Sequence, residues 1–525
     1  MRYGFVIDQD RCIGCHACTV ACKEEHQVPV GVFRTWVKYI EKGEFPHTSR
    51  HFGVMRCNHC DDAPCSTICP TNALYRRSDG IIDFDNQRCI GCKSCMQACP
   101  YDALYIDPNN NTAAKCNFCA HRVEAKLEPA CVIVCPTQAI LAGDLDDPAS
   151  KVSRTVATQK VSVRKPYKGT QPKLFYVGIE GDLLEPARLS RQNGYVFAEQ
   201  RDQRAAETTF DPALTREVYD VAHPSPWGWK IAAYLWTKSI AAGVMLVAGA
   251  MLWMMSRYFG GPIVNVASPL IALAALGVTG LLLIFDLKRP DRFFYLLTKP
   301  NLRSWLVIGA YILLAFGALC VAWLICGLRY DGIPTPLIIA TPLFAAATAC
   351  YSAFLFAQAK GRDLWQSPMF FWHLLMQSFV AGSAVYLLAT LGYHFRLMAM
   401  ATPHSSWAVN GFLLQRAFGF LQVSLLLSLC MAIMEQLMPH ASEDAKSASR
   451  NLTRGLLRAR FWGLAIGAGM VLPTFILGCI RYLPFRPATE SGFVTATVAA
   501  AVLALAGVWW FEDIWIKAGQ SVPLS

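Results

Sequence analysis

The sequence predicts a multidomain protein in which a small, cysteine-rich α+β domain precedes an all-α bundle of eight transmembrane helices. Two observations carry this prediction. Sixteen of the 21 cysteines lie between Cys12 and Cys135, and a series of long apolar segments begins after residue 230. The chain of 525 residues is 54% hydrophobic and only 16% charged, which is too apolar for an ordinary soluble protein.

We expect three parts: a cysteine domain over residues 1–180, an extended connector over 181–229 and a membrane domain over 230–525. The stretch 145–229 contains no cysteine and is rich in Lys, Arg, Pro and Gln, and within it "KLFYVGIEGD" (173–182) predicts a hairpin. The start of the chain, "MRYGFVIDQDRCIGC", has no apolar run and predicts no secretory signal. Without secretion, the cysteines indicate metal binding rather than disulfides.

The 16 clustered cysteines fall into four groups of four, which are Cys12, Cys15, Cys18, Cys22; Cys57, Cys60, Cys65, Cys69; Cys89, Cys92, Cys95, Cys99; and Cys116, Cys119, Cys131, Cys135. The first and third groups have the spacing C-x₂-C-x₂-C-x₃-C, in which three thiolates hold one iron–sulfur cube and the fourth ligates the other cluster of a pair. The groups therefore predict four [4Fe–4S] clusters. Zinc, the alternative, does not require the prolines that follow Cys69, Cys99 and Cys135.

Iron held by four cysteines has no open position for a substrate. The domain also shows no nucleophile–base pair and no glycine-rich phosphate loop, so we expect electron transfer without catalytic residues on this chain. The net charge is +11, but no basic stripe alternates with aromatic residues, which predicts no binding of nucleic acid. The other five cysteines lie singly in or beside apolar segments and predict packing alone: Cys320, Cys326, Cys350, Cys430 and Cys479.

Eight apolar segments are each long enough to cross a lipid bilayer, for which about 20 residues suffice. They cover approximately 232–255, 267–285, 305–326, 336–357, 369–392, 411–434, 461–480 and 492–511. The loops on the side of the cysteine domain hold 13 Lys and Arg, and the opposite loops hold 5. The positive-inside rule therefore predicts a multi-pass protein of the bacterial inner (cytoplasmic) membrane, with its cysteine domain in the cytoplasm. The alternative is a periplasmic domain, exported with a partner that has its own signal.

A chain of clusters joined to a membrane domain must exchange electrons with a carrier in the bilayer, and haem b and quinone are the main options. Haem b in a helix bundle needs paired axial ligands, mostly His. After residue 300 only His373 lies inside a span. We therefore expect quinone as the exchangeable substrate and no haem on this chain.

Polar residues within spans are costly, which makes them candidates for binding quinone. The candidate quinone-binding residues are Tyr234, Lys238, Asp286, Arg289, His373 and Gln377. The alternative is a structural role, in which Lys238 extends its amine to the membrane surface and Gln377 bonds a neighbouring backbone. Three acidic residues at span ends on the same side are expected in solvent, with a role in carrying protons as the alternative: Glu435, Glu512 and Asp513.

The cysteine groups make residues 1–150 resemble the double-ferredoxin-like, four-cluster subunits (DmsB, PsrB and NrfC type) of complex iron–sulfur molybdoenzymes. Residues 228–523 resemble the NrfD/PsrC family of polysulfide reductase membrane subunits, through "WGWKIAAYLWTKSIAAG", "FDLKRPDRFFYLL", "YSAFLFAQAKGRDLWQSP" and "KAGQSVPLS". The fusion departs from the family pattern, because the two parts are usually separate polypeptides.

The resemblance implies cross-pairing of the outer and of the inner cysteine groups. The implied sets are Cys12, Cys15, Cys18 with Cys135; Cys22 with Cys116, Cys119, Cys131; Cys57, Cys60, Cys65 with Cys99; and Cys69 with Cys89, Cys92, Cys95. It also implies that the outer-group clusters face a catalytic subunit that carries a molybdenum or tungsten bis-pterin cofactor, with no molybdopterin on this chain. The inner-group clusters would face the quinone pool.

The sequence therefore predicts an electron-transfer and membrane-anchor subunit. It would link membrane quinone to a catalytic subunit such as a sulfite or formate dehydrogenase, or a reductase of sulfur compounds. One alternative is a redox-driven proton-translocating module of a larger respiratory complex. Another is an electron path to multihaem cytochrome c partners.

Overall fold

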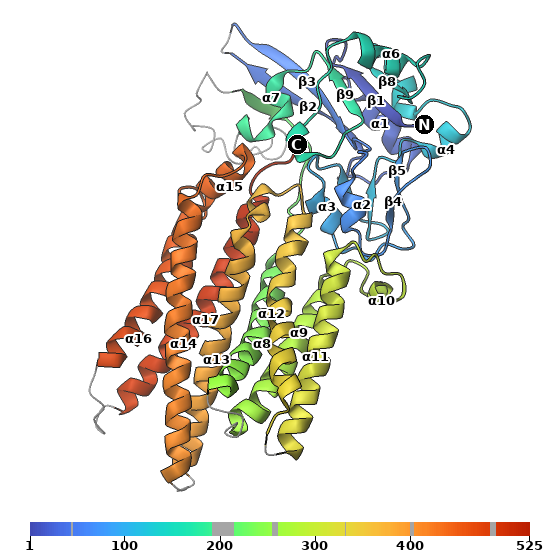
Figure 1. The fold of residues 1–525 in the computed structure, drawn as a ribbon. Coiled ribbons are helices and arrows are strands. Elements are labelled where there is room, and N and C mark those ends of the chain that lie inside the picture. Colours follow the sequence, from blue (N-terminus) through green and yellow to red (C-terminus); the bar gives the residue numbers. More distant parts are fainter. Residues whose placement is uncertain (44–45, 192–214, 255–260, 331, 400–403, 483–489) are drawn as a thin grey trace.

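The computed structural model describes residues 1–43, 46–191, 215–254, 261–330, 332–399, 404–482 and 490–525. The N-terminal α/β domain lies at one end of a bundle of long helices, and the C-terminal end of the chain returns to that domain (Figure 1). Lys38 Nζ donates to the carbonyl oxygen of Ser525 at 2.9 Å, and Arg164 Nη2 donates to that of Leu524 at 2.9 Å. The N-terminal domain and the C-terminal end are therefore in direct contact.

The first sheet of the N-terminal domain joins segments that lie far apart in the sequence. Its central strand β1 (Tyr3–Asp8) pairs antiparallel with β8 (Ile140–Asp144) and parallel with β9 (Leu174–Val177). Residues 173–182 therefore do not form the predicted hairpin, because β9 adds to this sheet and is followed by the helix α7 (Gly181–Leu184). The remaining elements of this region are α6 (Lys151–Thr158), η1 (Pro166–Lys168) and η2 (Pro186–Arg188).

A short helix accompanies each cysteine group. These helices are α1 (Ala17–Glu25), α2 (Pro64–Ile68), α3 (Ser94–Ala98), and α4 (Ala120–Glu124) with α5 (Ala130–Ile133). Two small antiparallel hairpins follow the second and third groups: β4 (Leu74–Arg76) with β5 (Ile82–Phe84), and β6 (Leu104–Asp107) with β7 (Thr112–Lys115). The last cysteine of the second and third groups lies directly after its helix, so its thiol points to a different neighbour from the thiols of the preceding loop.

The second sheet has the order β10-β11-β2-β3. Strands β2 (Thr35–Lys42) and β3 (Ser49–Arg56) pair antiparallel over their full length, with Val37 opposite Val54. The connector supplies β10 (Ser190–Arg191) and β11 (Arg216–Tyr219), and β11 pairs antiparallel with β2. The connector thus contributes to the fold of the N-terminal domain before the chain enters the first long helix.

The described part of the C-terminal half contains eight helical segments that are long and apolar enough to span a membrane, as the sequence predicts. They are α8 (Trp229–Met254), η4–α9 (Ile263–Ala267 and Ser268–Asp286), α11 (Trp305–Arg329), α12 (Thr335–Gln358), α13 (Met369–Ala399), α14 (His404–Leu437), η7–α16 (Arg460–Val471 and Leu472–Tyr482) and α17 (Glu490–Gln520). The loops between them contain η5 (Pro290–Arg292), α10 (Tyr295–Thr298), η6 (Asp363–Gln366) and α15 (Glu443–Thr453).

Helix α8 is the centre of the bundle. In the most apolar 18-residue stretch of α8, 89% of the residues are buried. In the corresponding stretches of η4–α9 and α11 only 22% are buried, so these helices face outward. Gly243 of α8 packs against Gly382 of α13, where an added Cβ would lie 1.8 Å from the carbonyl oxygen of Ser378. Small residues at such a crossing allow two membrane helices to approach closely.

His223, near the end of the connector, supports a pH-dependent contact with the N-terminal domain. Its Nδ1 lies 2.5 Å from Asp102 Oδ2, and its Nε2 lies 3.3 Å from Asp220 Oδ1. Burial alone lowers the pKa of His223, but the two carboxylates outweigh it and raise this pKa to about 9. This stabilisation is complete below the unfolded pKa of about 6.5 and is lost as the pH rises through about 9.

We therefore expect proteolysis of the connector to accelerate between about pH 6.5 and 9.5, because the contact weakens as His223 loses its proton. The measurement is limited proteolysis of the purified protein at a series of pH values, corrected for the pH dependence of the protease. The variant His223→Gln should be cleaved at a rate that no longer changes over this range. Equal slopes for the two proteins would contradict the role assigned to His223.

Candidate functional site

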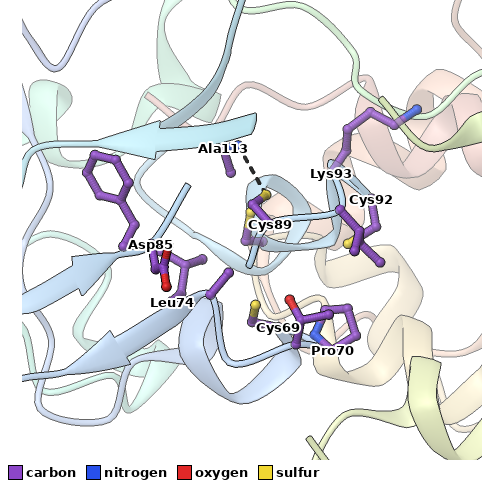
Figure 2. Close-up of a pocket in the computed structure, with 13 residues that line it drawn as sticks. Cys69, Pro70, Leu74, Asp85, Cys89, Cys92, Lys93 and Ala113 are labelled. Carbon is purple, nitrogen blue, oxygen red and sulfur yellow. Dashed lines mark hydrogen bonds between the residues drawn. The ribbon is translucent and has the colours of Figure 1, made fainter. Parts of the chain in front are cut away.

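A small cavity lies between the second and third cysteine groups and is lined by Cys69, Cys89, Cys92 and Cys95. Figure 2 shows Cys69, Cys89 and Cys92 around this space, whereas the amine of Lys93 points away from it. The backbone N–H groups of Gly91 and Ala113 each donate to Cys89 Sγ at 3.4 Å. Three cysteines of the third group thus share one cavity with the last cysteine of the second group.

A second small cavity shows the reciprocal arrangement. Cys57, Cys60 and Cys65 line it together with Cys99, the last cysteine of the third group. The two inner groups therefore exchange their last cysteines. This is the arrangement that the C-x₂-C-x₂-C-x₃-C spacing gives in two-cluster ferredoxins.

The first and fourth groups, which are the outer ones, also lie close to each other. The thiols that act electrostatically on Cys22 are Cys116, Cys131 and Cys119, which belong to the fourth group. Cys12 interacts in turn with Cys135, the last cysteine of that group, and with Cys15. Each outer group thus lies beside the other, as the inner groups do, and the side-chain chemistry of the four groups fits iron–sulfur clusters.

Burial keeps these thiols protonated unless a cation holds the thiolates. Burial, together with the neighbouring thiol of Cys69 or Cys57, raises the pKa of Cys92 and the pKa of Cys99 to about 12. Because metal ligation requires the deprotonated form, binding of iron must supply the free energy that removes these protons. Cluster assembly and folding of this domain are therefore coupled.

The cavity around Cys92 abuts the membrane domain. Lys93, inside the cysteine loop, forms an ion pair of 2.8 Å with Asp286 at the end of α9. The backbone of the loop also accepts a hydrogen bond at Gly91 O from the N–H of Lys288, at 3.2 Å. An added Cβ on Gly91 would lie 2.6 Å from Lys288 Cβ, so glycine is required for this approach.

The second cysteine group contacts the loop before α11. Asn301 Nδ2 donates to the carbonyl oxygen of Cys69 at 2.8 Å, and Ser304 Oγ donates to that of Ile68 at 2.7 Å. From the third group, Gln97 donates to Gln520 Oε1 at the end of α17, at 2.6 Å. These polar contacts fix the cysteine-lined cavity against the ends of three membrane helices.

Within the bundle, one cluster of buried side chains surrounds Lys238 of α8. Its side chain is 0% exposed, and its Nζ donates to Ser352 Oγ at 2.7 Å and to the carbonyl oxygen of Ala349 at 3.0 Å. The amine also lies 4.8 Å from the centre of the Tyr351 ring. Lys238 therefore does not extend its amine to the membrane surface.

A second cluster of buried polar side chains surrounds His373 of α13. Its Nε2 lies 2.9 Å from Glu435 Oε2 of α14, and Ser367 Oγ donates to Glu435 Oε1 at 2.7 Å. Within the described residues, both amide atoms of Gln377 are buried without a hydrogen-bond partner, so it does not bond a neighbouring backbone.

Two of the three acidic residues expected in solvent are in fact buried. Glu435 is 4% exposed and Glu512 is 2% exposed, because each lies inside the bundle against a polar side chain. Ser239 Oγ donates to Glu512 Oε1 at 3.4 Å. Asp513 instead pairs with Lys517 at 2.6 Å on the surface of α17.

Comparison with known proteins accounts for both halves of the chain. Residues 217–522 match the family described as polysulphide reductase, NrfD. The chain therefore belongs to the NrfD family. Residues 49–145 match a 4Fe-4S dicluster domain, and residues 3–24 match a 4Fe-4S binding domain.

The curated relatives cover the iron–sulfur part. A tetrathionate reductase subunit of Salmonella typhimurium is 45% identical over 189 residues, which are 35% of this chain and 76% of the relative. A polysulfide reductase chain of Wolinella succinogenes is 41% identical over 179 residues, or 34% and 94%. Protein NrfC of Escherichia coli K12 is 44% identical over 180 residues, or 34% and 81%. This protein is thus an iron–sulfur electron-transfer subunit fused to an NrfD-type membrane subunit.

The NrfD domain separates the six candidate quinone-binding residues into different environments. Tyr234, Lys238, His373 and Gln377 are all buried within it. Asp286 lies at its surface, in the ion pair with Lys93. Arg289 lies outside this group, partly exposed and paired with Asp291 at 2.8 Å.

Sequence reasoning missed the residues that join the buried candidates. Ser352 and Tyr351 contact Lys238, and Glu435 contacts His373, but each partner lies on another helix. Phe511 of α17 packs beside His373 with ring centres 5.2 Å apart, and the next residue, Glu512, contacts α8. The only signal in the sequence was an acidic residue near the end of an apolar span.

Proposed function

We propose that this chain carries electrons through four [4Fe–4S] clusters between a separate molybdenum or tungsten bis-pterin catalytic subunit and membrane quinone. The observation that carries the proposal is the cysteine-lined cavity of Cys69, Cys89, Cys92 and Cys95, which lies directly against the NrfD domain. The curated relatives are named as subunits of tetrathionate and polysulfide reductases, which supports a catalytic partner.

The proposed ligand sets follow the exchanged pairs of cysteines: Cys12, Cys15, Cys18, Cys135; Cys22, Cys116, Cys119, Cys131; Cys57, Cys60, Cys65, Cys99; and Cys69, Cys89, Cys92, Cys95. The clusters would supply one-electron carriers between the two reaction sites. The protein's own residues hold them, exclude water from them and fix their order from the outer groups to the membrane.

The catalytic subunit would dock at the outer cysteine groups. Cys15 is exposed there, and the outer groups also carry exposed apolar side chains at Ile13, Val20 and Ile133. Exposed apolar residues around an electron-transfer site are typical of a protein–protein interface. The NrfD helices cover the opposite end of the domain, which favours the outer cysteine groups as the docking surface.

Quinone would bind in the half of the NrfD domain that lies next to Cys92. Reduction of quinone takes up protons as well as electrons, and Lys238 and the His373–Glu435 pair are buried groups that can donate or pass them. The distribution of Lys and Arg in the loops supports a bacterial inner membrane with the iron–sulfur domain in the cytoplasm.

The proposal predicts that the purified chain contains about 16 iron atoms and about 16 acid-labile sulfides, because each of four clusters holds four of each. Iron and sulfide analysis together with electron paramagnetic resonance (EPR) of the dithionite-reduced protein makes the measurement. We also expect a quinol to reduce the clusters, or a quinone to oxidise the reduced clusters. A protein rich in zinc and poor in iron would overturn the proposal.

A further inference from the structure

Two buried cations lie between the cysteine groups of the N-terminal domain. Arg56 directly precedes Cys57, and Lys115 directly precedes Cys116. Both side chains are 0% exposed. A buried charge is costly unless an opposite charge compensates it, so each should have a specific electrostatic partner.

The Arg56 side chain turns away from its neighbour Cys57 and reaches the fourth cysteine group. Its Nη1 lies 3.2 Å from Cys131 Sγ. Its Nε and Nη2 donate to Thr35 Oγ1 at 3.2 and 3.0 Å, and its guanidinium lies 4.5 Å from the centre of the Phe5 ring. The position of the guanidinium is therefore fixed by contacts on three sides.

Lys115 makes the reciprocal contact. Its backbone adjoins Cys116 of the fourth group, but its Nζ lies 3.6 Å from Cys57 Sγ of the second group. The amine also donates to the carbonyl oxygens of Cys116, at 2.8 Å, and of Ile82. Each cation thus adjoins one cysteine set through its backbone and contacts a sulfur of the other set through its side-chain nitrogen.

We propose that Arg56 and Lys115 are positioning residues that raise the reduction potentials of the two central clusters, those held by Cys131 and by Cys57. A cluster with four thiolates becomes more negative when it accepts an electron. A fixed cation beside its sulfur, in a medium of low dielectric constant, stabilises this reduced form more than the oxidised form. The inference rests on the four-cluster assignment proposed above.

Arg56 and Lys115 would give the two central clusters of the electron path the highest reduction potentials. As thiolates in the assembled clusters, Cys131, Cys116 and Cys18 would be the negative groups around Arg56, and Cys57, Cys65 and Cys116 would be the main ones around Lys115. A matched control is Lys38, which is also buried in this domain but forms ion pairs with Glu217 at 2.7 Å and with Asp220 at 3.2 Å. Its charge is compensated within the protein, so its removal should leave the clusters unaffected.

The test is a potentiometric titration of the purified full chain, monitored by EPR. In Arg56→Gln, one cluster should become harder to reduce by about tenfold in its equilibrium constant, which equals about 59 mV for one electron. In Lys115→Met, a different cluster should shift in the same direction. The charge-retaining variants Arg56→Lys and Lys115→Arg should shift less, and Lys38→Met should not shift any cluster.

Iron content separates the possible failures. Full iron with all cluster potentials unchanged in both Arg56→Gln and Lys115→Met would overturn the inference and leave the four-cluster assignment intact. A wild-type protein without cubane EPR signals would overturn the proposed function itself. If Arg56→Gln loses iron, its cluster potentials cannot be compared with those of the wild type, and the Lys115 variants provide the test instead. Equal cluster potentials in Lys115→Met and Lys115→Arg would also overturn the inference.

Discussion

Replacement of Cys92 with alanine is expected to remove the cluster nearest the membrane and to stop electron transfer to quinone. Cys92 lines the cavity that abuts α9, and its loop meets that part of the NrfD domain through the Lys93–Asp286 ion pair. Iron should fall from about 16 to about 12 atoms per chain, because one of four clusters is lost. Iron analysis, EPR and quinol-dependent reduction of the remaining clusters make the measurement.

The matched control for this variant is Cys430→Ala, which removes an exposed cysteine of α14 that lines neither cavity. It should retain full iron and full activity with quinone. Transfer to quinone at the wild-type rate in Cys92→Ala would show that electrons enter the membrane by another route.

Replacement of Lys238 with methionine is expected to slow quinone turnover by about 10²–10⁴-fold, the range found when a group that transfers protons is removed. Lys238 is completely buried and held by Ser352 and Ala349, so its amine has a fixed position in the bundle. The clusters should keep their EPR signals and iron content. Steady-state turnover with a soluble quinone analogue gives the comparison.

Lys230→Met is the control for Lys238→Met because it removes a lysine two helical turns earlier on the same helix. Lys230 is partly exposed, and its Nζ donates to the carbonyl oxygen of Phe285 at 2.9 Å. We expect its turnover to remain close to that of the wild type. Equal turnover in both variants would exclude Lys238 from the quinone site, and His373→Gln would then be the next variant to examine.

Local patterns in the sequence were sufficient to predict the main architecture. Long apolar runs predicted eight spans because membrane helices satisfy their hydrogen bonds internally. The short cysteine spacings predicted iron–sulfur chemistry because three neighbouring thiolates of one loop converge on one site. Both predictions depend on residues that are close together in the chain.

Contacts between distant residues could not be predicted in this way. The strand Leu174–Val177 resembled half of a hairpin, but it pairs with β1, which lies at the other end of the domain's sequence. Glu435 resembled a surface residue at a span end, yet His373 on another helix keeps it buried. The ion pair of Lys93 with Asp286 joins residues 193 positions apart, and no local pattern relates them.

Strand β11 of the connector, which pairs with β2, also has a consequence for assembly. It ties the N-terminal domain to the chain about ten residues before α8 begins. This tether raises the effective concentration of one half near the other to the millimolar range or above. The contacts at Gly91, Lys93 and Cys69 therefore need only orient the halves and need not supply the affinity of a complex between separate polypeptides. A catalytic partner would then have one surface to recognise, and the electron path behind that surface would always be complete.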